Sequence, residues 1–108
     1  MLLAAACGGG EEPGIERELA GQLATQSSRA AANLDAADFC GARSDVTLLQ
    51  QQTIAAINSR RVPGELQEEL LASVNALLDT ITCTPPAAGD GAADEARELA
   101  DWLRDRSD

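Results

Sequence analysis

Two cysteines placed symmetrically about a turn constrain the fold of this chain more than any other feature. Cys40 and Cys83 flank two stretches whose apolar residues recur at helical spacing, and "NSRRVPG", residues 58–64, separates these stretches. The residue before Pro63 disfavours the α-helical region, so the first helix must end there. Each cysteine lies about 21 residues from this turn. The spacing therefore predicts two helices of similar length, joined by a short turn.

In an antiparallel helical hairpin, residues at equal distances from the turn lie at the same height. We therefore expect Cys40 and Cys83 to form a disulfide at the open end of the hairpin. Closing a loop of about 44 residues would stabilise the fold by about 4 kcal/mol, through the lost entropy of the unfolded chain. Two buried free thiols and a metal-binding pair are the alternatives. Two cysteines with no histidine and no CxxC spacing make a poor zinc site.

Apolar residues at three- and four-residue spacing predict the helices. Four helices are expected. The first covers residues 15–37, the second begins near Asp38, and the third covers residues 63–82. The fourth is short and amphipathic and covers residues 93–106. Proline and glycine keep residues 84–92 non-helical, as a linker. No stretch alternates in the way that predicts a strand.

The predicted fold class is all-α. A two-helix hairpin would leave its leucine stripe exposed, so the helix over residues 15–37, or one from a partner chain, must cover it. We expect residues 15–83 to form a small three-helix bundle containing the disulfide-closed antiparallel hairpin. The helix over residues 93–106 then packs across the bundle or stays free.

Composition narrows the classes of function. The chain has 108 residues, the length of one domain, and 44 % of them are apolar. Phe39 and Trp102 are its only aromatic residues, so the core must be aliphatic. Eighteen acidic residues against eight arginines give a net charge of −10. Such a surface repels phosphates, which argues against binding of nucleic acid or of anionic lipid through charge.

The residue types that carry catalysis are scarce. The chain has no histidine, which removes the commonest general base and the commonest transition-metal ligand. No Ser–His or Cys–His pair and no phosphate-binding loop can be assembled. We therefore expect no enzymatic activity, no cofactor and no bound metal. Glu65, Glu68 and Glu69 could chelate calcium, but calcium sites normally use a loop, so a solvated helix N-terminus is favoured.

Cys7 has a different setting from the other two cysteines. The stretch "LAAAC", residues 3–7, resembles a bacterial lipobox, in which small residues precede the cysteine that receives diacylglycerol, although Ala4 stands where a leucine-like residue is usual. The following "GGGEEPG", residues 8–14, is typical of a flexible tether. The alternative is an incidental thiol near a frayed terminus. Residues 1–6 are too few for a signal peptide, so we expect them to be its remnant, with the true start upstream.

The stretch "LDAADFCGARSDVTLLQQQTIAAINSRRVPGELQEELLASVNALLDTITC", residues 34–83, resembles a group of small secreted lipoproteins common in actinobacteria. These proteins share a lipobox, a flexible acidic leader, and a pair of helices opened by one cysteine and closed by another. The resemblance implies export, lipid attachment at Cys7 and the disulfide hairpin. It implies no activity.

The expected role is a non-enzymatic, lipid-anchored module on the outer face of the cytoplasmic membrane that binds another envelope protein. Trp102, with Leu99 and Leu103, is a candidate partner contact, since tryptophan is enriched at binding hot spots. The alternative is that Trp102 seals one end of the core. Arg60 and Arg61 compensate a helix dipole or meet an acidic partner. A small apolar-ligand carrier and a regulatory subunit of an envelope enzyme complex are the alternative functions.

Overall fold

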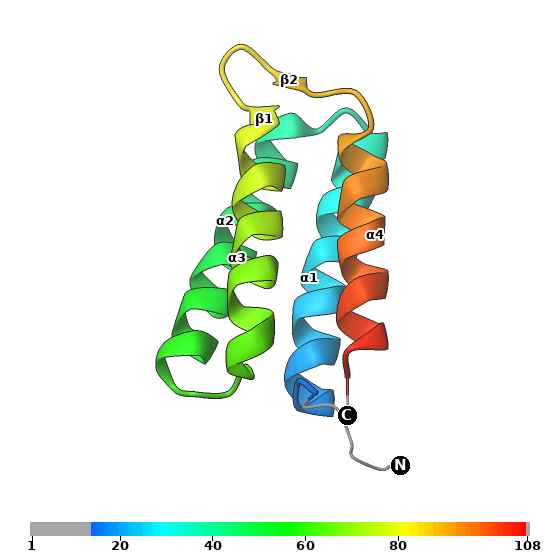
Figure 1. Ribbon diagram of the computed structural model, residues 1–108. Helices are drawn as coiled ribbons and strands as arrows, with labels where there is room; N and C mark the ends of the chain where they lie inside the picture. The colour runs from blue at the N-terminus through cyan, green and yellow to red at the C-terminus, as the bar shows by residue number, and fades with distance from the viewer. Residues whose placement is uncertain (1–13, 108) are drawn as a thin grey trace.

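A computed structural model describes residues 14–107 of the chain, so the predictions for residues 1–13, including Cys7, lie outside the described residues. The elements, in order, are α1 (Arg17–Asp35), α2 (Phe39–Asn58), α3 (Gly64–Asp79), β1 (Ile81–Thr82), β2 (Ala87–Ala88) and α4 (Ala92–Asp105). The described part is thus mostly helical, as predicted (Figure 1). No helix in it is long and apolar enough to cross a membrane.

The four helices run alternately up and down, each antiparallel to the next (Figure 1). Helix α1 packs most extensively against α4 and next against α2, and α2 packs against α3. The contact between α3 and α4 is the weakest of these. Helix α1 therefore makes the most extensive packing in the described part, with α4 and α2 as its neighbours, and α3 packs mainly against α2.

The core is aliphatic, and the predicted stripes supply it. The positions predicted at helical spacing that are buried include Leu19, Leu23, Leu34, Val46, Leu49, Thr53, Leu70, Val74, Leu77 and Ile81. Buried alanines accompany them on α1, α2 and α4. Small side chains let helix backbones approach closely, which suits a core without buried aromatic rings.

Polar side chains in the middle of α1 join it to its neighbours. Ser27 is fully buried, and its Oγ donates a 2.6 Å hydrogen bond to the carbonyl of Ala96 on α4. Gln26 is also buried, and its Nε2 donates to the carbonyl and to Oδ1 of Asp45 on α2, both at 3.1 Å. Asn33 donates to the other carboxylate oxygen of Asp45 at 2.6 Å. These bonds satisfy buried polar groups and fix how α2 and α4 sit on α1.

The helix predicted over residues 63–82 ends earlier, and a small β-hairpin follows it. Ile81 pairs with Ala88 and Thr82 with Ala87 in an antiparallel ladder. The prediction of no strand was therefore wrong, and residues 84–92 are partly ordered as β2. Two-residue strands are too short to show an alternating pattern. Ile81 continues the helical spacing of α3, although it lies in β1, and its side chain is buried in the core.

The sequence predicts a three-helix bundle, with the fourth helix packed across it or free. The structure does not confirm this arrangement. Helix α4 lies alongside α1 over its length (Figure 1). Its inner face is buried in the common core through Ala92, Ala96, Leu99, Ala100 and Leu103. The amphipathic stripe predicted for this helix is therefore part of the core.

Candidate functional site

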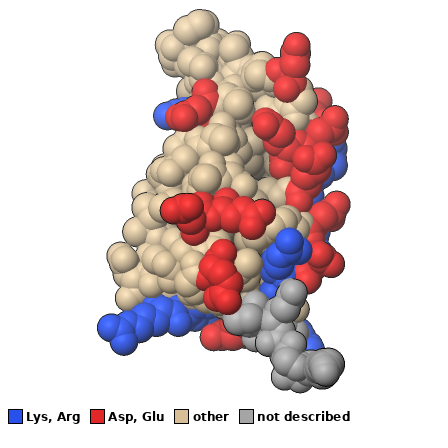
Figure 2. Space-filling model, in the orientation of Figure 1, with Lys and Arg blue, Asp and Glu red and all other residues tan. Residues whose placement is uncertain are grey.

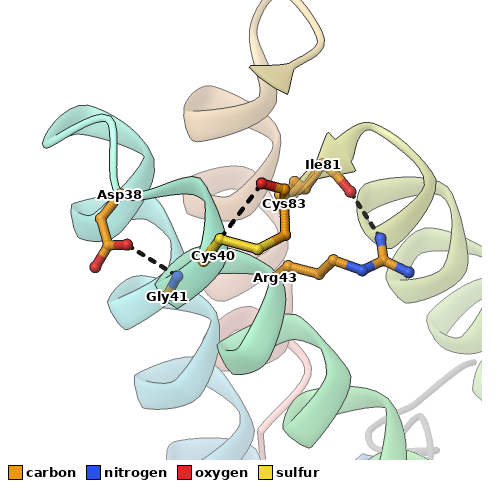
Figure 3. The surroundings of a disulfide bond; sticks show 6 residues. All are labelled: Asp38, Cys40, Gly41, Arg43, Ile81 and Cys83. Atoms are coloured by element: carbon orange, nitrogen blue, oxygen red, sulfur yellow. Dashed lines mark hydrogen bonds between the residues drawn. A yellow bond between two sulfur atoms is a disulfide. The ribbon is translucent and has the colours of Figure 1, made fainter. Parts of the chain in front are cut away.

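The predicted disulfide between Cys40 and Cys83 is confirmed, and with it the predicted closure of the helical hairpin. The two Cα atoms lie 4.5 Å apart although 43 positions separate them in the sequence. Cys40 lies in the first turn of α2, and Cys83 follows β1, at the end of the molecule that carries the β-hairpin (Figure 3). The alternatives of two free thiols or a metal-binding pair are thereby excluded for these residues.

The surroundings of the disulfide are held by a helix cap and an arginine (Figure 3). The second helix begins near Asp38, as predicted. Asp38 is its N-cap, and the Asp38 carboxylate accepts a hydrogen bond from the amide of Gly41 at 3.0 Å. A Cβ on Gly41 would lie 2.4 Å from that carboxylate, so glycine leaves room for the cap. Arg43 donates to the carbonyls of Leu78 and Ile81 at 3.2 and 2.7 Å. Arg43 thus fastens the end of α3 and the start of β1 to α2.

The three candidate contact residues on α4 lie in two different environments. Leu103 is fully buried and Leu99 is 6 % exposed, so both belong to the core. Trp102 is half-buried against that core. Its Nε1 is buried, with no hydrogen-bond acceptor among the described residues. The guanidinium of Arg106 lies over its ring, 5.1 Å from the centroid, in cation–π geometry.

Trp102 lies in a groove between α3 and α4. The groove has a volume of about 290 Å³ and is lined by Ser73, Ala76, Leu77, Glu95, Glu98, Leu99 and Trp102. It forms because α3 presents the small side chains of Ser73 and Ala76 there, while α4 is held against α1. This groove could not be predicted from the sequence, because the separate patterns of α3 and α4 do not determine how the two helices are placed relative to each other.

The rim of the groove is acidic. Glu95 and Glu98 line it from α4, and Glu69 lies one helical turn before Ser73, on the same side of α3. Within residues 14–107, none of these three carboxylates has an ion-pair partner, since the ion pairs there involve other acids. Figure 2 shows Asp and Glu side chains distributed over the face formed by α3 and α4.

The two adjacent arginines at the α2–α3 turn, Arg60 and Arg61, lie in different environments. Arg61 forms a 2.7 Å ion pair with Glu16 at the start of α1. The hydrogen bond from Arg61, and then its charge, lower the pKa of Glu16. Arg60 is exposed and has a φ of 61°, just beyond the end of α2. Arg61 therefore ties the turn to α1.

The remaining carboxylates form no metal centre in the part of the chain that is described. Glu65, Glu68 and Glu69 are exposed in the first half of α3. No group of three or more His, Cys, Asp or Glu residues that could hold a metal ion is found among residues 14–107. Comparisons of the chain with protein-family models, with curated proteins and with solved structures find no significant match.

Proposed function

We propose that this protein is a lipid-anchored, non-enzymatic module at the outer face of the cytoplasmic membrane, where it binds another protein of the cell envelope. The Cys40–Cys83 disulfide carries this proposal. Structural disulfides persist mainly in oxidising compartments, so the bond supports export. With these two cysteines paired, Cys7 is the remaining cysteine of the chain. Its small preceding residues and following glycines favour lipid attachment, in keeping with the resemblance to actinobacterial lipoproteins.

The position of Ile15 indicates which end of the domain a lipid anchor on Cys7 would attach to. The amide of Ile15 donates to the carbonyl of Arg106 at 2.8 Å, at the end of the molecule opposite the disulfide (Figure 1). Eight residues lead from Cys7 to Ile15, and at full extension they span at most about 28 Å. A lipid on Cys7 would therefore hold the end of the molecule that carries Ile15 within about 28 Å of the membrane surface, and the disulfide lies at the end farther from this attachment point.

The groove beside Trp102 supports a binding role. It combines a half-buried tryptophan, small side chains and charged rim residues, a combination common at protein interfaces. Its volume of about 290 Å³ lies at the lower limit of typical small-molecule pockets. Partner side chains therefore suit it better than the apolar ligand of the carrier alternative.

Metabolic labelling tests the anchor. The chromosomal gene is given a C-terminal epitope, and cells are fed an alkyne analogue of palmitate. We expect label on the wild-type protein in the membrane fraction. The Cys7→Ser variant should lose the label and be released from membranes, whereas Cys40→Ser/Cys83→Ser should keep the label. Wild-type protein without label, or a Cys7→Ser variant that keeps it, would contradict the proposal.

A further inference from the structure

We infer that the groove between α3 and α4 binds an arginine- or lysine-bearing segment of the partner protein. This inference rests on the proposed binding role and names the chemistry of its partner. Helix α4 packs extensively against α1 and only weakly against α3. On the loose side an open groove remains, lined by the half-buried Trp102 and by the edges of Leu77 and Leu99, which are buried in the core.

The charges on the rim specify the sign of the occupant. Glu95 and Glu98 line the groove, and Glu69 lies one helical turn before its lining residue Ser73. None of these carboxylates has an ion-pair partner among residues 14–107. The arginines of α4 do not fill this role. Arg97 bonds to Asp35 and Asp94, and Arg104 points to Ser28 and Asp101, which places both toward α1. A cationic side chain from outside would complement the rim, and an acidic one would be repelled.

The floor of the groove suits the rest of such a side chain. Arginine and lysine carry an apolar stem beneath a charged head, and the stem can lie over the exposed Ala76 and the half-buried Trp102 while the head reaches the carboxylates. The ring of Trp102 already holds one guanidinium, that of Arg106, at 5.1 Å. The buried indole Nε1 still lacks an acceptor among the described residues.

The test uses the full chain with Cys7→Ser, so that no lipid is attached. The probe is a blocked peptide of about twelve residues, with arginine at every fourth position among alanines and leucines. Its control has citrulline, which is neutral and nearly the same shape, in place of each arginine. Trp102 is the only tryptophan, so its emission reports directly on the groove. Binding is measured at near-physiological salt, where long-range attraction is screened.

We expect the arginine peptide to change the Trp102 emission saturably, with the citrulline peptide at least about fivefold weaker. Glu95→Gln/Glu98→Gln should weaken binding at least about fivefold. Glu65→Gln/Glu68→Gln removes the same charge from α3 outside the groove lining, and should change affinity less than about twofold. Circular dichroism checks that each variant is folded.

Equal losses in the two double variants would overturn the inference, because they would show attraction to net charge alone. An unchanged Trp102 emission would also overturn it. A wild-type dimer that Glu95→Gln/Glu98→Gln dissociates would instead assign the groove to a second copy of this chain. These measurements use unlipidated protein, so their failure is separate from a failure of lipid labelling at Cys7.

Discussion

Ser27 on α1 and Ala96 on α4 are joined by a 2.6 Å hydrogen bond inside the core, across 69 positions of sequence. The Ser27 hydroxyl has no exposure to water in the folded state. It is therefore a polar group whose burial is tolerated because the α4 backbone accepts its hydrogen.

Replacing Ser27 with alanine should destabilise the protein by about 1 kcal/mol, since it removes one buried hydrogen bond. Urea denaturation followed by circular dichroism measures the change. Ser28→Ala is the matched control, because Ser28 is only half-buried and its bond from Arg104 is 3.3 Å long. We expect the control to change the free energy of unfolding by less than about 0.5 kcal/mol. Equal effects at the two positions would contradict this role for Ser27.

Removing the disulfide should lower the free energy of unfolding by about 4 kcal/mol, from the loop that Cys40 and Cys83 close. The comparison is Cys40→Ala/Cys83→Ala against its parent, both in a Cys7→Ser background that prevents thiol exchange. The reduced parent should behave like the double variant. A difference below about 1 kcal/mol would mean that the hairpin is held almost entirely by packing.

The end of α1 offers a stabilising substitution. Ala37 has a φ of 60°, and the amide of Asp38 bonds to the carbonyl of Asn33 in a Schellman-type helix end. A residue with a Cβ is strained there, and glycine is not. Ala37→Gly should therefore raise stability by about 0.5 to 1 kcal/mol.

The neighbouring position provides the control for that substitution. Ala36 has a φ of −85°, which alanine adopts without strain. Ala36→Gly should give no gain, because it only increases the freedom of the unfolded chain. Thermal unfolding of both variants separates the two expectations. A loss of stability on Ala37→Gly would show that this helix end gains nothing from glycine.

The ion pair of Arg61 with Glu16 makes a pH-dependent contribution to stability. The pKa of Glu16 is lowered from its ordinary value of about 4.5, first by the hydrogen bond from Arg61 and then by its charge. Because this pKa is lower in the folded state, the ion pair stabilises the folded protein at pH values above the ordinary pKa of the carboxyl group. This contribution is lost as the pH falls from about 4.5 through the lowered pKa.

Arg61→Gln should return the pKa of Glu16 toward its ordinary value. The variant should therefore lose less stability than the wild type when the pH falls below about 4.5. Carboxyl NMR titration gives the pKa, and thermal unfolding between pH 3 and 7 gives the stability. Arg60→Gln should leave the pKa of Glu16 unchanged, since Arg61 is the arginine that bonds to it. The same titration shift in both variants would assign the effect to net charge instead.

The sequence predicted what depends on local pattern. Cysteine spacing and the turn at Pro63 gave the disulfide hairpin, and Asp38 marked the start of α2. The end of α3 was missed because Ile81 obeys helical spacing while lying in a strand. The placement of α4 was missed because many surfaces can receive an amphipathic helix, and the choice rests on long-range contacts such as that of Ser27 with Ala96.

The candidate groove was predictable only in part for the same reason. Trp102 could be singled out by its rarity, but one wall of the groove, formed by Ser73, Ala76 and Leu77, comes from α3, 25 to 29 positions earlier in the sequence. Leu99 and Leu103 have the spacing of a binding stripe and are buried instead. Nothing in the local sequence distinguishes a stripe that meets α1 from one that meets another protein.

The bridge between Ile15 and Ser107 has a consequence for the connectivity of the fold. It brings the beginning and the end of the described part together, so that its four helices follow one another around a nearly closed ring. A short linker could join these ends, and the ring could be reopened at the exposed turn between Arg60 and Arg61. Such a circular permutant would keep every helix contact while its termini emerge at the α2–α3 turn.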